Sequence, residues 1–160
     1  PENSIETILQ AFVNSNTKRK FVVIGNTENK YGRYIRNKFS DERIIYLGYV
    51  SGIEKLDALR KFSNLYFHGH TVGGTNPSLL EAMSSEALIC ANNNEFNKAI
   101  LGYDAYYFHC KNCITPLFEM DKLEERSIFV SNNIRKIREK YSWNKINSDY
   151  ENFMISTLSK

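Results

Sequence analysis

The chain has 160 residues, of which 42% are hydrophobic and 24% charged, as expected for one soluble globular domain. Its net charge of +3 suits an anionic ligand such as a nucleotide but is too small to indicate a nucleic-acid-binding protein. The three cysteines form no disulfide framework, which indicates a reducing compartment, and no signal peptide or run of about 18 apolar residues is visible.

The first element predicted is a helix over residues 1–14. Its apolar residues recur with helical spacing, and Asn3 and Glu6 have the spacing of a capping box. The apolar stripe consists of Ile5, Ile8, Leu9, Phe12 and Val13. The sequence opens in mid-pattern without an initiator Met, so we expect it to have been cut from a longer protein.

Strands and helices then alternate. The strand Phe21–Ile24 ends at Gly25 and Asn26, and the strand Ile44–Leu47 ends at the turn 48–51. A basic helix over residues 31–39 separates them, and a helix over 53–62 follows the second. We interpret the basic side chains of the first of these helices as a solvated face, with a patch for acidic lipid or substrate as the alternative.

The most informative stretch is His68–Met83, which follows a short apolar strand at 65–67. Gly73 and Gly74 give a backbone that can approach a ligand closely. Thr75 or Asn76 suits the N-cap of a helix whose first turn holds Pro77. Free backbone N–H groups at such a helix start favour an anion such as phosphate. The residues expected at this anion site are Gly73, Gly74, Thr75, Asn76, Pro77, Ser78 and Leu79. Glu81, about one turn into the helix, can reach back to accept hydrogen bonds from sugar hydroxyls.

The alternation continues with strands at 88–91 and 105–108 around a helix at 95–101. This order predicts a Rossmann-like α/β fold, a parallel sheet with helices on both faces. The glycine loops at Gly25, Gly48 and Gly73 then meet at one sheet edge, which predicts a single ligand site. Beyond Thr115 the chain is predicted to be helical, and a last helix covers 146–158.

Histidines and cysteines are not predicted to bind a metal. His68 and His70 lack a third and fourth ligand, although His70 is a candidate hydrogen-bond donor to phosphate. Cys110 and Cys113 form a C-x-x-C without a second copy and without the thioredoxin-like pattern, a helix N-terminus after a strand, that a redox role needs. We therefore interpret them as incidental free thiols.

The segment Gly73–Met83 resembles the donor site of family-four GT-B glycosyltransferases, and residues 68–83 resemble the rhamnosyltransferase-type members that build bacterial surface polysaccharides. The resemblance covers nearly the whole chain. It implies the C-terminal, donor-binding half of such an enzyme, with Glu81 on the nucleotide ribose and Tyr49 and Val50 near the nucleobase. The first of the family's two glutamates falls at Gly73, so one expected contact to the donor sugar is missing.

The resemblance implies sugar transfer from a nucleoside-diphosphate sugar, with dTDP-rhamnose suggested by the subfamily, to a polysaccharide or lipid-linked acceptor. It implies no metal, no other cofactor and no catalytic nucleophile in this half. The expected partners are the donor, an N-terminal acceptor-binding domain onto which residues 141–160 cross, and a membrane-associated acceptor. The expected location is the cytoplasm, at the inner face of a bacterial membrane. The alternatives are a GT-B sugar-nucleotide epimerase and a non-catalytic α/β interaction module.

Overall fold

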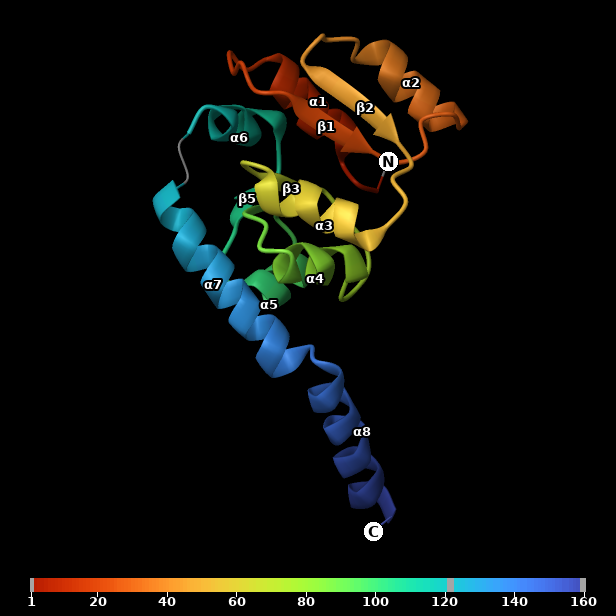
Figure 1. Ribbon diagram of the computed structural model, residues 1–160, viewed down its shortest axis with the longest axis vertical. Helices are drawn as coiled ribbons and strands as arrows, with labels where there is room; N and C mark the ends of the chain where they lie inside the picture. Colours follow the sequence, from red (N-terminus) through yellow and green to blue (C-terminus); the bar gives the residue numbers. More distant parts are fainter. Residues whose placement is uncertain (1, 121–122, 159–160) are drawn as a thin grey trace.

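The computed structural model describes residues 2–120 and 123–158, in which helices and strands alternate (Figure 1). The strands are β1 (Phe21–Ile24), β2 (Ile44–Gly48), β3 (Tyr66–His68), β4 (Ile89–Asn92) and β5 (Tyr106–Phe108). The helices are α1 (Ile5–Val13), α2 (Lys30–Lys38), α3 (Ile53–Phe62), α4 (Pro77–Ser84), α5 (Glu95–Leu101), α6 (Lys111–Ile114), α7 (Leu123–Lys140) and α8 (Trp143–Leu158), with a 3-10 turn η1 (Thr115–Phe118).

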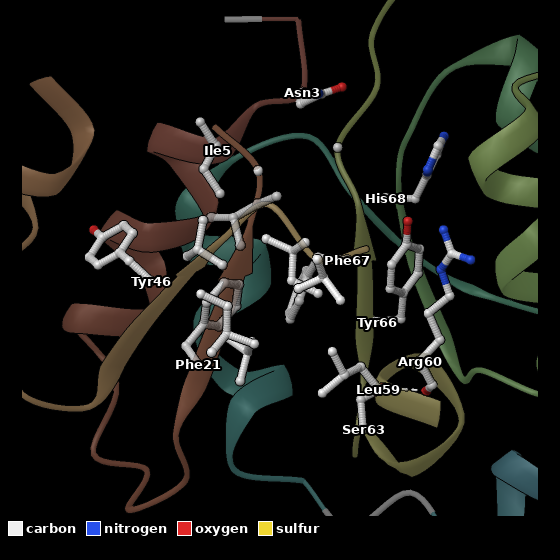
Figure 2. A pocket seen from close by; sticks show the side chains of 18 of the residues that line it. Asn3, Ile5, Phe21, Tyr46, Leu59, Arg60, Ser63, Tyr66, Phe67 and His68 are labelled. Atoms are coloured by element: carbon white, nitrogen blue, oxygen red, sulfur yellow. Dashed lines mark hydrogen bonds between the residues drawn. The ribbon is translucent and has the colours of Figure 1, made fainter. Parts of the chain in front are cut away.

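All strand pairs are parallel, which confirms the predicted α/β class. The strands form two hydrogen-bonded units rather than one sheet: β1 pairs with β2, and β4 pairs with β3 and β5. In the described part of the chain no ladder joins β1 to β3, and a cleft separates the two strands (Figure 2). Phenylalanine rings bridge the units instead, with ring centroids of Phe21 and Phe67 5.7 Å apart and those of Phe67 and Phe118 5.1 Å apart.

The unit β3–β4–β5 contains the better-packed core. The side chains of Ile89, Cys90 and Ala91 in β4 are fully buried, since strands flank β4 on both sides and helices cover both faces. Helix α4 contributes Leu79 and Met83 to this core and packs against α7. Continuous apolar runs of this kind are typical of central parallel strands.

The apolar stripe of α1 is confirmed, because Ile8, Leu9 and Phe12 are buried in the core. The predicted capping box is wrong. The N-cap is Ser4, in a left-handed conformation with φ 50°, and its side chain makes no capping hydrogen bond. Asn3 and Ser4 instead contact the loop after β3, so tertiary contacts displaced the local cap.

Helix α8 projects away from the rest of the molecule (Figure 1). It buries none of its residues, and its large apolar side chains are exposed. These are Trp143, Tyr150, Phe153, Met154, Ile155 and Leu158. Within residues 2–120 and 123–158, no helix combines the length and apolar character needed to cross a membrane.

Candidate functional site

A cleft of about 1700 Å³ runs along β1 and β3 from their amino to their carboxyl ends (Figure 2). Its amino end is lined by apolar side chains, including Phe21, Leu59 and Phe67. Its carboxyl end is lined by polar groups, including Asn26, His68 and Ser78. The volume exceeds the several hundred Å³ up to about 1000 Å³ that a small-molecule site usually occupies. A ligand bound at the polar end would therefore leave the apolar part of the cleft open.

Helix α4 begins beside this polar end as predicted. Asn76 is its N-cap, with Oδ1 accepting hydrogen bonds from the backbone N–H of Ser78 at 2.9 Å and from its hydroxyl at 2.8 Å. Pro77 occupies the first turn, where its missing N–H has no cost. Leu79 is fully buried, so its side chain anchors the helix in the core.

The glycine loop keeps its donors free. Gly73 has φ 92°, which an L-residue rarely adopts, and no atom within 4 Å opposes a Cβ at Gly74. In the described structure no hydrogen bond takes up the backbone N–H groups of residues 73–76, whereas that of Ser78 is held by Asn76. The loop can therefore offer several N–H groups to an anion.

Two other segments hold the start of this loop. The N–H of Thr71 donates to the carbonyl of Glu2 at 2.9 Å, and the Ser4 hydroxyl donates to the carbonyl of Gly69 at 2.9 Å. From the other side, the amide of Asn94 donates to the carbonyl of His70 at 2.9 Å. The residues before α1 and the turn before α5 thus fix the loop.

His70 lies beside the glycine loop. Its Nδ1 is 3.0 Å from Asn3 Oδ1, and its Nε2 lies 3.9 Å from the position of a Cβ on Gly73. Because Asn3 Oδ1 can only accept, Nδ1 carries the proton and Nε2 faces the loop. In this tautomer Nε2 is a hydrogen-bond acceptor, so donation from His70 to a phosphate stays a prediction.

His68 has the more unusual environment. It is only 4% exposed, it lines the cleft, and its Nε2 has no hydrogen-bond partner within the described residues. Burial, with a smaller contribution from His70, lowers the pKa of His68 to about 4, so the ring is neutral near pH 7. A buried polar atom without a partner is costly, and a bound ligand is one way to satisfy it.

Arg60 was missed by the sequence analysis. Its guanidinium, 11% exposed, contacts Glu81 Oε2 at 2.7 Å and Asp57 Oδ1 at 3.0 Å and lies 6.0 Å from the ring centre of Tyr66 (Figure 2). Glu81 is therefore held by an ion pair from α3 and is not itself part of the cleft lining. A lone Arg in an amphipathic helix gives no sequence signal for such a role.

The turns after β1 and β2 meet directly. The N–H of Gly25 donates to the carbonyl of Gly48 at 2.9 Å, which places Asn26 and Val50 at the cleft. Tyr49 is 85% exposed and is not among the residues that line the cleft. Among the predicted site residues, one group lines the cleft (Gly25, Asn26, Val50, Ser78) and a second lies on or near the glycine loop (His70, Gly73, Gly74, Thr75, Asn76, Pro77). The remaining three, Tyr49, Leu79 and Glu81, do not line the cleft.

No protein-family model matches the chain, and no curated protein is significantly similar to it. Solved structures do match. HepE from Anabaena in complex with UDP superposes with a TM-score of 0.81 at 12% identity, over 98% of this chain and 46% of HepE. The C-terminal domain of LpcC, a group 1 glycosyl transferase family protein from Francisella tularensis, gives 0.72 at 17% identity, over 89% and 81% of the two chains.

This chain has the fold of a GT-B C-terminal domain. A TarM variant from S. aureus, solved with UDP, fondaparinux and alpha-GlcNAc-glycerol, gives a TM-score of 0.72 at 20% identity, over 95% of this chain and 33% of TarM. The chain thus spans about half of HepE and a third of TarM, and most of the isolated LpcC domain. Open parallel α/β sheets bind ligands outside the carboxyl ends of their strands, where the polar end of the cleft lies.

Proposed function

We propose that this chain is the donor-binding part of a glycosyltransferase that takes its sugar from a nucleoside diphosphate. The observation that carries the proposal is the glycine loop before α4, which presents unused backbone N–H groups at the carboxyl edge of a GT-B C-terminal domain. The complexes of HepE with UDP and with UDP-glucose support a nucleotide-sugar ligand for this fold.

The chemical role of the loop is electrostatic. As the bond between sugar and diphosphate breaks, negative charge grows on the leaving diphosphate. Backbone N–H groups already aimed at that position stabilise the charge without reorganising. No residue of this part has to act as a nucleophile, and no metal is required in this scheme.

Glu81 is proposed to accept hydrogen bonds from the ribose hydroxyls. The ion pair with Arg60 fixes one carboxylate oxygen, Oε2, and leaves Oε1 for the nucleotide. Tyr66 and Asp57 hold the guanidinium in turn. Arg60 is therefore a positioning residue in this proposal.

The finer parts of the proposal concern donor and acceptor. The resemblance of residues 68–83 to rhamnosyltransferases supports dTDP-rhamnose as donor and a polysaccharide or lipid-linked acceptor, reached at the inner face of a bacterial membrane. The exposed apolar side chains of α8 support its packing on an N-terminal acceptor-binding domain.

The experiment is a titration of the protein with UDP, dTDP and GDP in which binding is monitored through the chemical shifts of the backbone amides. We expect one diphosphate to shift the amides of residues 73–78 and those near Val50. Glu81→Gln should weaken its binding by roughly tenfold or more, the value of a hydrogen bond to a charged group.

Glu86→Gln is the matched control. Glu86 has the same 44% side-chain exposure as Glu81 and also forms an ion pair, with Lys61 at 2.8 Å, but it lies just beyond the C-terminal end of α4. The proposal is wrong if no diphosphate binds the full-length protein at millimolar concentration, or if both variants weaken binding equally. Donor turnover by the full-length protein without any acceptor would indicate an epimerase instead.

A further inference from the structure

The segment after β5 carries a pair of thiols in contact. The Sγ atoms of Cys110 and Cys113 are 2.7 Å apart, and both residues are half-buried. Cys90, the remaining cysteine, is fully buried in β4. Cys90 is therefore a reference cysteine within the same protein, because solvent does not reach its thiol.

The local structure differs from the sequence-based interpretation of these cysteines. Strand β5 ends at Phe108, and Cys110 is the N-cap of α6, so the C-x-x-C follows a strand and opens a helical turn. The prediction that this context is absent is wrong. The helix was missed because four residues are too short to show an apolar period. The N–H of Cys113 donates to the carbonyl of Cys110 at 3.2 Å and closes the turn that brings the thiols together.

The two thiols are not equivalent. A hydrogen bond from the Cys113 thiol, followed by backbone N–H groups of Cys113 and Asn112, lowers the pKa of Cys110. The same thiol–thiol hydrogen bond raises the pKa of Cys113. Since the thiolate is the nucleophile, Cys110 is the attacking sulfur and Cys113 the resolving one.

Access and a proton acceptor are both present. Cys110 lines a shallow depression of about 660 Å³, together with His109 and Lys111 and with residues of α1. A small disulfide can therefore reach Cys110. His109 Nε2 lies 3.5 Å from Cys113 Sγ, where it can take the proton of the resolving thiol.

We propose that Cys110 and Cys113 form a reversible disulfide by exchange with a low-molecular-weight disulfide such as oxidised glutathione. The Cys110 thiolate attacks one glutathione sulfur, forming a mixed disulfide and releasing one glutathione thiolate. Cys113 loses its proton and attacks the Cys110 sulfur, which releases the second glutathione. Two protein thiols are oxidised, one glutathione disulfide is reduced to two thiols, and the two protons end on these.

The test exposes the full chain to oxidised glutathione with a chelator present, quenches in acid and measures intact mass and disulfide-linked peptides. We expect the wild-type protein to lose two hydrogen atoms through a Cys110–Cys113 link, which dithiothreitol reverses. Cys113→Ser should stop at a glutathione adduct on Cys110. Cys110→Ser should form its adduct on Cys113 more slowly, because Cys110 lines the depression and accepts the backbone N–H hydrogen bonds that stabilise its thiolate, whereas Cys113 is not part of that lining.

Cys90 serves as the control within each sample, because it should remain unmodified until the protein is denatured. The proposal fails if the wild-type protein keeps both thiols while Cys113→Ser forms its adduct, since the second step would then not occur. It also fails if the two single variants react at the same rate. A 1:1 zinc complex formed without chelator that blocks oxidation would show that His109, Cys110 and Cys113, whose donor atoms lie within 4.8 Å of one another, bind metal instead.

Discussion

The units β1–β2 and β3–β4–β5 are built from similar apolar runs but are packed very differently. In β4, Ile89, Cys90 and Ala91 are all fully buried. In β1, Phe21 and Val23 pack on the helix side, whereas Val22 and Ile24 are each 40% exposed on the other face. In β2, Ile45 is 39% and Leu47 44% exposed on that same face.

This difference in packing indicates that stability comes mainly from one unit, whereas the candidate binding site lies between the two. In the unit β3–β4–β5 the central strand β4 is the most deeply buried, whereas most of β3 and β5 is half-buried, and the core of this unit anchors α4 through Leu79. The unit β1–β2 presents one apolar face to solvent and to the cleft, and its other face joins a buried core shared with α1, β4 and β5. The candidate site lies between a rigid wall and a less tightly packed one, and stability measurements can test that contrast.

The largest expected effect comes from the same substitution in both units. Ile89→Ala should lower the free energy of unfolding by about 3–4 kcal/mol, because a fully buried side chain leaves a cavity. Ile45→Ala, at a side chain that is 39% exposed, should cost about 1 kcal/mol. Urea unfolding of both variants measures the two values. Equal losses would contradict the contrast between the units.

The next effect depends on pH and concerns His68 at the rigid wall. Its pKa is lowered from 6.5 to about 4 in the folded protein. The unfolded chain therefore binds a proton below pH 6.5 that the folded chain refuses until about pH 4, so stability falls as pH falls through this window. The loss at the acid end is up to about 3 kcal/mol.

His68→Gln should remove this part of the pH dependence. Above pH 6.5 the free energy of unfolding of the variant should change with pH in the same way as that of the wild type. His109→Gln, at an exposed histidine, is the matched control and should keep the wild-type slope. The measurement is urea unfolding at several pH values between 4 and 7.5, and an unchanged slope in His68→Gln would contradict the buried, neutral ring.

A smaller effect is expected at the segment that holds the glycine loop. A Cβ on Gly69 would lie 1.8 Å from the carbonyl oxygen of Asn3, so Gly69→Ala must displace the residues before α1 and should cost about 1–3 kcal/mol. Gly74→Ala meets nothing within 4 Å and should stay within about 0.5 kcal/mol of wild type. Thermal unfolding of both variants is the measurement. A loss in Gly69→Ala alone would indicate the close contact with Asn3, whereas equal losses would indicate that the loop tolerates no added side chain.

The smallest effect concerns a polar attachment within the β1–β2 half. The Arg43 guanidinium donates to the carbonyls of Ser15 at 2.9 Å and Thr17 at 2.8 Å and pairs with Asp41 at 2.7 Å. Arg43→Met should cost about 1–2 kcal/mol, because partly buried carbonyls lose their donors.

Lys20→Met is the control for Arg43→Met, since exposed Lys20 reaches a single carbonyl, that of Glu42, at 3.2 Å. Chemical unfolding should show little change for this variant. If both substitutions cost the same, the hydrogen bonds of Arg43 do not hold α1 to β2. The same guanidinium lowers the pKa of Asp41 to about 2, so the ion pair persists down to that pH.

The sequence determined the local structure of this protein to a large extent. Asn76 and Pro77 define the start of α4 because N-capping and a fixed φ are properties of those residues alone. The stripe of α1 and the apolar runs of the strands likewise specify their own element type. The order of those elements was sufficient to predict parallel pairing. Of the three glycine loops predicted to meet at one edge, those at Gly25 and Gly48 are in contact, whereas Gly73 follows a strand of the other hydrogen-bonded unit and does not line the cleft.

Tertiary structure alone decided which partners these elements meet. Asn3 leaves its predicted cap for His70, Arg60 approaches Glu81 from 21 residues away, and Cys110 gains its position from the end of β5. The burial that makes His68 neutral depends on neighbours from other elements. Local propensity acts over a few residues, whereas ion pairs, desolvation and the cleft between β1 and β3 depend on distances that the folded chain sets.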